Sequence, residues 1–202
     1  MIIGNKIDMD TNKGIVNFGI STNWNVITGG PSSGKTTIVN QLKKLGFSST
    51  PEAARVLIDI GINNGLTIQE IRRDEEQFNQ SILCIQMAME NILVPDHVCF
   101  HDRGTPDSLA YIRLSGGDES IARKFAMKRK YNKIFLLELL PFEKDYARTE
   151  DSDKAKQIEQ MIYETYEELN YEVILVPVST IEERMDFILD SLGINNLINE
   201  SN

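Results

Sequence analysis

Cysteine is scarce in this sequence, which holds only Cys84 and Cys99. Both lie in apolar segments, and they form neither a C-x-x-C pair nor a Cys/His spacing typical of metal ligands. This pattern favours buried free thiols over a disulfide or a metal site, because a free cysteine behaves as a small apolar residue. We therefore expect a protein of the reducing cytoplasm.

Long apolar runs and excess positive charge are also lacking. No stretch of about 18 apolar residues occurs, so we expect no membrane span. The first residues show no charged segment leading into a long apolar one, so we expect no secretory signal. Lys and Arg number 21 against 30 Asp and Glu, a net charge of −9. Because duplex binding needs a positive field, we expect no nucleic-acid partner, although a local basic site for a phosphorylated small molecule is compatible with this charge.

One strong motif is present. Residues 29–36 fit G-x-x-x-x-G-K-[ST], follow the apolar run 24–28 and precede a helical pattern of apolar residues. Strand, loop and helix in this order predict a phosphate-binding loop. Glycine leaves the backbone N–H groups open to an anion, and the helix dipole adds partial positive charge there. The residues expected to bind the nucleotide are Gly29, Gly30, Pro31, Ser32, Ser33, Gly34, Lys35, Thr36 and Thr37.

The ligands expected at this loop are a nucleoside triphosphate and Mg²⁺; the loop itself does not distinguish ATP from GTP. Lys35 would bridge the β- and γ-phosphates, and the Thr36 hydroxyl would ligate Mg²⁺. Asp102 follows the apolar strand 97–101, where a carboxylate can hold Mg²⁺ or take a proton from an acceptor hydroxyl; a helix cap or a buried ion pair is the alternative. Glu52 and Arg55 begin a helix after another strand, at the sheet edge where ligands bind, so both could contact a ligand. The alternatives fit equally well: Glu52 as a first-turn acid favoured by the helix dipole, and Arg55 as part of a surface ion pair.

The wider pattern predicts an α/β fold, a three-layer α/β/α P-loop sandwich with a mainly parallel five-stranded sheet. Pro51 would open the second helix, and a capping box at Thr67 would open one long helix to about Val94. Residues 1–22 would form an N-terminal extension or edge hairpin with a strand at 15–18, residues 23–193 the P-loop domain, and residues 194–202 a polar tail. The strands of the sheet are expected at 24–28, 47–50, 97–101, 134–137 and 173–176.

Two charged segments each have two interpretations. A helix carries five basic residues between 123 and 130, which would form either a solvated face or a wall facing phosphate; they are Arg123, Lys124, Lys128, Arg129 and Lys130. The polar segment 141–153 contains Arg148. An arginine on a mobile lid would neutralise charge on a moving phosphoryl group, and a solvated loop is the alternative.

Together these motifs resemble the NadR/TRP-channel-translocation-defect-type AAA domain, a family of small P-loop proteins described as ATPases or kinases. The resemblance covers about residues 24–192. That family is related to the nucleoside kinase domain of NadR, which phosphorylates ribosylnicotinamide, and more distantly to nucleoside and nucleotide monophosphate kinases. The adenylyltransferase domain of NadR has no counterpart in this sequence. The segments that carry the resemblance are 28–37, 51–55, 101–107, 139–142, 148–151 and 171–177.

The resemblance implies a kinase that moves the γ-phosphoryl group of ATP to a small nucleoside- or nucleotide-like acceptor. It implies that Lys35, Asp102, Glu52 and Arg148 act in catalysis, that Glu52, Arg55 and Arg103 bind the acceptor, and that Thr36 and Asp102 bind the metal. The alternatives are an ATPase or GTPase without a small acceptor, and a nucleotide- or phosphoinositide-binding regulatory module that docks through residues 123–130. The acceptor and the oligomeric state are left open.

Overall fold

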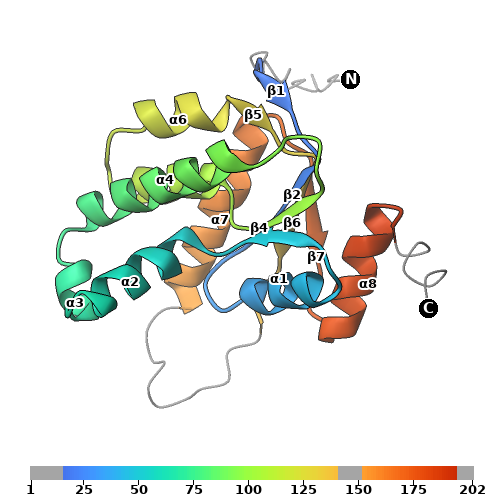
Figure 1. Cartoon of the computed structure of the whole chain (residues 1–202), viewed down its shortest axis with the longest axis horizontal. Helices are drawn as coiled ribbons and strands as arrows, with labels where there is room; N and C mark the ends of the chain where they lie inside the picture. The colour runs from blue at the N-terminus through green and yellow to red at the C-terminus, as the bar shows by residue number, and fades with distance from the viewer. Residues whose placement is uncertain (1–15, 141–151, 195–202) are drawn as a thin grey trace, which may run out of the picture.

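A five-stranded parallel sheet forms the centre of the computed structural model, which describes residues 16–140 and 152–194 (Figure 1). The strand order is β3-β4-β2-β6-β7, and every neighbouring pair is parallel. The predicted α/β fold with its parallel five-stranded sheet is thus confirmed. The strands are β2 (Trp24–Thr28), β3 (Ser48–Thr50), β4 (Cys99–Asp102), β6 (Lys133–Leu137) and β7 (Val173–Val176).

Helices cover both faces of this sheet (Figure 1). One face packs against α1 and α8, and the other against α4, α5, α6 and α7. No helix within the described ranges is both long and apolar enough to cross a membrane. The helices are α1 (Lys35–Lys44), α2 (Ala53–Asn63), α3 (Ile68–Ile71), α4 (Glu75–Ile92), α5 (Thr105–Leu114), α6 (Ser120–Ala126), α7 (Ser152–Glu168) and α8 (Ile181–Ser191).

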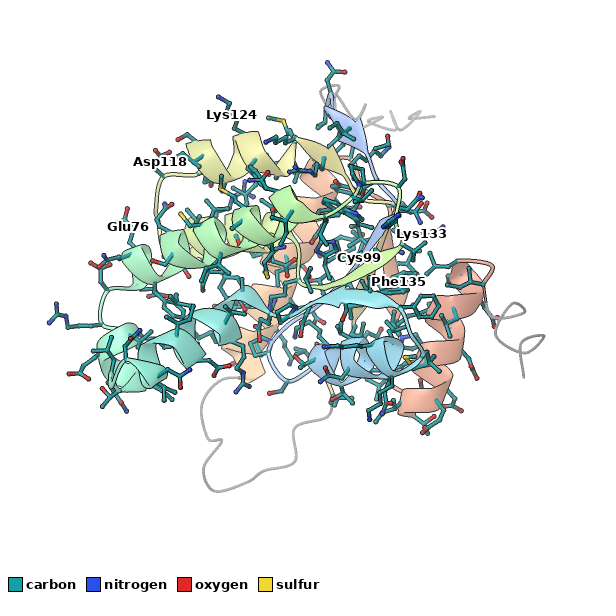
Figure 2. All side chains as sticks on the ribbon, in the orientation of Figure 1. Glu76, Cys99, Asp118, Lys124, Lys133 and Phe135 are labelled. Atoms are coloured by element: carbon teal, nitrogen blue, oxygen red, sulfur yellow. The ribbon has the colours of Figure 1, made fainter. Side chains whose placement is uncertain are left out.

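Both faces of the sheet are apolar. Successive strand residues point to opposite sides, so a strand with a continuous apolar run contributes apolar side chains to both faces. In β2, Trp24 and Val26 join the core under α4 to α7, whereas Ile27 joins the core under α1 and α8. Figure 2 shows Cys99 and Phe135 inside the molecule, while Asp118 and Lys124 project outward. Cys99 is the buried thiol that we expected, but the same expectation is wrong for Cys84, which is exposed; both are free.

The single long helix predicted from Thr67 to Val94 is wrong, because the structure has two helices there. The capping box at Thr67 is real, with Glu70 N–H donating to the Thr67 hydroxyl over 3.2 Å, but it opens only the short α3. Asp74 then caps α4, accepting from the Gln77 N–H over 2.9 Å. A side chain that caps a backbone N–H favours a new helix start over a continuous helix.

The other corrections concern element boundaries. Helix α2 begins at Ala53 with Glu52 as its N-cap, so Pro51 precedes the helix instead of opening it. Residues 16–18 are not a strand; the described part of the N-terminal extension supplies β1 (Ile20–Ser21), which pairs in parallel with β5 (Arg129–Lys130). The basic helix accordingly ends at Ala126.

The register of the central strands determines which residues meet. Ile27 of β2 lies opposite Asp102 of β4, and Thr50 of β3 lies opposite His101. The carboxyl ends of β3, β4 and β2 are therefore adjacent. The segments that follow them carry Glu52, Arg103 and the phosphate-binding loop.

Candidate active site

The loop between β2 and α1 is shaped by its glycines. Gly29 has φ +137°, and a Cβ there would come within 2.5 Å of the Leu137 carbonyl oxygen. Gly34 has φ +90° and forms the N-cap of α1. These positions need glycine because of backbone conformation and close approach, and the N-terminus of α1 opens onto the loop as an anion site requires.

Lys35 is buried beneath this loop, with only 6% of its surface exposed. Its Nζ donates to the Gly30 carbonyl over 2.6 Å and to Ser33 Oγ over 3.1 Å. Burial, together with the nearby positive charge of Arg103, lowers the pKa of Lys35 to about 7. An ammonium group whose charge is disfavoured in this way gains from a phosphate that compensates the charge.

Thr36 and Asp102 form a pair that fits Mg²⁺. The Thr36 hydroxyl donates to Asp102 Oδ2 over 2.6 Å, and the second oxygen, Oδ1, is buried without a hydrogen-bond partner. Burial raises the pKa of Asp102. A carboxylate oxygen that is buried and unsatisfied beside a hydroxyl is the donor set that Mg²⁺ uses together with phosphate oxygens and water.

Arg103 links two carboxylates next to this pair. Its Nε donates to Glu52 Oε1 over 3.2 Å, and its Nη1 donates to Asp107 Oδ1 over 3.0 Å. Arg103 also holds φ at +72°, a strained value for a residue with a side chain. Asp107 is fixed in turn by the Gly104 N–H and by the Tyr166 hydroxyl, at 3.0 and 2.7 Å. The arginine is thus held rigidly at the end of β4.

A cavity of about 280 Å³ opens beside these ion pairs, between α2, α4 and α5. Its polar lining includes Glu52, Arg103 and Asp107, and its apolar lining includes Phe78 and Ile82. Lys35 lies within electrostatic range of Glu52, Asp102, Arg103 and Asp107. A small molecule in this cavity would therefore lie next to the phosphate-binding loop.

Arg55 is the one expected acceptor residue that the structure places apart from this cavity. It is exposed on α2 and borders a separate, smaller hollow of about 160 Å³ that also touches Thr36 and Asp102. Arg148, the expected lid arginine, lies outside the described residues.

The basic segment lies at the other end of the sheet. Residues 129–130 pair with β1, and these strands precede the amino ends of β6 and β2, whereas the phosphate-binding loop follows the carboxyl end of β2. Arg123 pairs with Glu119 and Glu168 at 2.9 and 2.6 Å. This placement disfavours a wall facing phosphate, and it does not make a uniformly solvated face either, since Arg129 is half-buried with its guanidinium 5.6 Å from the centre of the Trp24 ring.

Three further residues of the site were not predicted from the sequence. Asp107 is a buried acid in the first turn of α5, a position that also suits an ordinary helix cap. Gln86 lies on the apolar stripe of α4, four residues after Ile82, and a polar residue on such a stripe was a usable signal. Arg184 of α8 binds three carbonyl oxygens, those of Ser33, Glu138 and Pro177, at 2.7, 3.2 and 2.9 Å, and nothing in its local sequence indicates this.

Three solved structures share the fold of this chain at 12–14% sequence identity. The chain is similar to a deoxyadenosine kinase from M. mycoides (TM-score 0.59, 12% identity, covering 84% of this chain and 98% of that one). It is also similar to a thymidylate kinase from Ehrlichia chaffeensis (TM-score 0.60, 14% identity, covering 84% of this chain and 97% of that one). A third similar structure is a NadR protein in complex with NAD and AMP-PNP (TM-score 0.62, 14% identity). The match covers 88% of this chain but only 50% of the NadR chain. These likenesses show the fold.

The family comparison covers more than half of the chain. A search of the curated proteins found no matching relative. A family model described as an AAA domain matches residues 24–184, from the first residue of β2 to Arg184 of α8. The chain therefore belongs to this family of AAA domains.

Proposed function

We propose that this protein is a Mg²⁺-dependent kinase that transfers the γ-phosphoryl group of ATP to a hydroxyl or phosphate of a small nucleoside-like acceptor. The observation that carries the proposal is the position of the 280 Å³ cavity, whose lining residues Glu52 and Arg103 lie beside Lys35 and Asp102. A hydrolase that acts on ATP alone has no need of an acceptor cavity at this place.

The chain's residues divide the chemistry between them. Lys35 and the N–H groups at the start of α1 would bind the β- and γ-phosphates and compensate their charge. Thr36 and Asp102 would hold Mg²⁺, which when bound neutralises phosphate oxygens and orients them. Arg103, fixed by Asp107, would anchor the acceptor.

Glu52 would take the proton of a hydroxyl acceptor. As the bond from the acceptor oxygen to the γ-phosphorus forms, the bond from that phosphorus to the β-phosphate oxygen breaks, and ADP leaves with the electron pair. The acceptor proton moves to the Glu52 carboxylate, whose side chain is 27% exposed at the cavity wall.

The test is the rate of ADP formation from ATP and Mg²⁺, with and without a panel of nucleosides and nucleoside monophosphates. We expect one class of acceptor to raise the rate at least about tenfold, and Lys35→Ala to lower the stimulated rate about a hundredfold or more. Lys124→Ala, on the exposed side of α6, is the matched control and should leave the rate unchanged. ADP formation that no acceptor stimulates would contradict the proposal and favour an ATPase.

A further inference from the structure

A kinase with this loop can phosphorylate either a hydroxyl or a phosphate, and the two acceptors need opposite surroundings. A phosphate monoester carries about −1.5 to −2 charges at pH 7 and needs arginine or lysine side chains that are not already neutralised. A hydroxyl acceptor needs a carboxylate to receive its proton. The charges and hydrogen-bonding groups of the acceptor cavity therefore distinguish the two classes.

The charges on the described cavity wall disfavour a phosphate. Its lining includes three acids, Glu52, Glu75 and Asp107, against two cations, Arg72 and Arg103. Arg103 is shared between Glu52 and Asp107, so its charge is already compensated. Arg72 is exposed, with its guanidinium 4.9 Å from the centre of the Phe78 ring. The described lining thus carries more acids than cations, and Arg103 is already compensated, which leaves the exposed Arg72 as the cation open to an incoming phosphate.

The buried amides add acceptor atoms deeper in the cavity. Gln86 Nε2 faces Glu90 Oε1 at 2.9 Å and the Arg103 carbonyl oxygen at 3.5 Å, and both of these groups can only accept. The nitrogen must therefore lie on that side, which leaves the Gln86 Oε1 atom to accept from a ligand.

A buried network fixes this orientation of Gln86. Glu90 is 1% exposed and also receives hydrogen bonds from the Thr105 hydroxyl over 2.7 Å and from the Tyr131 hydroxyl over 2.5 Å. Reversing the Gln86 amide would place its oxygen against a buried carboxylate, which is electrostatically unfavourable. Asn79, also in the lining, turns its Nδ2 toward Ser115 Oγ and the Tyr111 carbonyl at 3.3 and 3.5 Å, so its oxygen too is left to accept.

We infer that the acceptor is an unphosphorylated, nucleoside-type compound with N–H and O–H donors, and that a hydroxyl is the group phosphorylated. Phe78 and Ile82 supply apolar walls for a ring, and the oxygens of Gln86, Asn79 and Glu52 supply the acceptors for its donors. The inference deepens the kinase function proposed above and rests on it.

The experiment compares matched pairs, each a nucleoside and its own 5′-monophosphate. Isothermal titration calorimetry with the non-hydrolysable ATP analogue AMP-PNP and Mg²⁺ measures binding, and transfer from γ-labelled ATP measures reaction. We expect at least one nucleoside to bind at least about tenfold more tightly than its monophosphate and to be phosphorylated.

Glu52→Gln tests the reason for this selectivity through binding alone. The variant removes one of the two carboxylates that neutralise Arg103, so the preference for nucleoside over monophosphate should narrow by about tenfold. Glu182→Gln, an exposed acid on α8, removes the same charge far from the cavity and should leave the preference unchanged. An equal narrowing in both variants would show that overall charge, and not this cavity, sets the preference, and would overturn the inference.

The outcomes distinguish a failure of this inference from a failure of the proposed kinase function. If only a monophosphate is bound and phosphorylated, the inference is overturned while the kinase function stands. If no compound of either class is bound or phosphorylated, both are overturned.

Discussion

At the scale of single residues, the buried charge of Lys35 has a measurable consequence. Burial and Arg103 hold its pKa at about 7 in the free protein, far below the ordinary lysine value. Bound phosphates favour the charged form and raise that pKa, so nucleotide binding above pH 7 takes up a proton. The second pKa of a phosphate is about 6, so the ligand itself is ionised in this range.

We predict that nucleotide affinity falls as pH rises from about 7.5 to about 9, approaching tenfold per pH unit for one proton taken up. Calorimetry in two buffers of different ionisation enthalpy counts the protons directly. Lys35→Met, which cannot be protonated, should bind more weakly and take up fewer protons. Wild-type binding at pH 8 without any proton uptake would contradict the assignment of this pKa.

Asp102 supports a second prediction, on metal dependence. Asp102→Asn keeps the size of the side chain but removes the negative charge of the carboxylate. The Oδ1 atom of that carboxylate is buried and has no hydrogen-bond partner. We expect the Mg²⁺ concentration for half-maximal activity to rise at least about tenfold, with little change in the KM of the acceptor. An unchanged Mg²⁺ requirement would remove Asp102 from the metal site.

At the scale of elements, α8 fastens the phosphate-binding loop to the sheet. The Arg184 guanidinium, 3% exposed, holds Ser33 in the loop, Glu138 after β6 and Pro177 after β7. Hydrogen bonds from a charged donor contribute about 1.5–3 kcal/mol each, so this contact constrains the loop strongly. We expect Arg184 to act as a positioning residue, because the hydrogen bonds of its guanidinium go to backbone carbonyls of the loop and the strand ends.

We predict that Arg184→Lys raises the KM for ATP about tenfold and lowers the melting temperature, because one ammonium group cannot satisfy three carbonyls in a planar arrangement. The KM of the acceptor should change much less, and a merely structural loss would affect both substrates alike. Glu182→Gln, two residues away and exposed, is the control. An unaltered KM for ATP would show that the loop does not depend on α8.

Sequence could predict those parts of the site that depend on local spacing. Lys35, Thr36 and Asp102 belong to a fixed motif or to the end of an apolar strand, and the register of β2 against β4 does bring them together. Arg184 and Ser33 are 151 residues apart, and no local pattern indicates that they pair. The break between α3 and α4 was missed for a related reason: the apolar period continues through it, while one capping side chain, Asp74, starts a new helix.

At the scale of the whole molecule, the sheet with its two apolar faces supplies the stability on which this site depends. Ile134 of β6 is fully buried among side chains from α4 to α7, whereas Ile121 of α6 is 58% exposed. The same isoleucine-to-alanine substitution at the two positions therefore compares the loss of a buried side chain with the loss of an exposed one.

We predict that Ile134→Ala lowers the free energy of unfolding by about 2–5 kcal/mol, through lost burial and the cavity left behind. Ile121→Ala should change it by less than about 0.5 kcal/mol, since surface substitutions have small effects. Urea denaturation followed by circular dichroism measures both. Similar losses in the two variants would contradict the description of this core.

The central claim is that ATP and an acceptor react together in this protein, and the most direct measurement is product stoichiometry. Phosphorus NMR of a reaction with ATP, Mg²⁺ and the nucleoside that binds best counts ADP, free phosphate and phosphorylated acceptor in one sample. The account predicts about one phosphorylated acceptor for each ADP and almost no free phosphate. Equal amounts of ADP and free phosphate, with no phosphorylated acceptor, would contradict it.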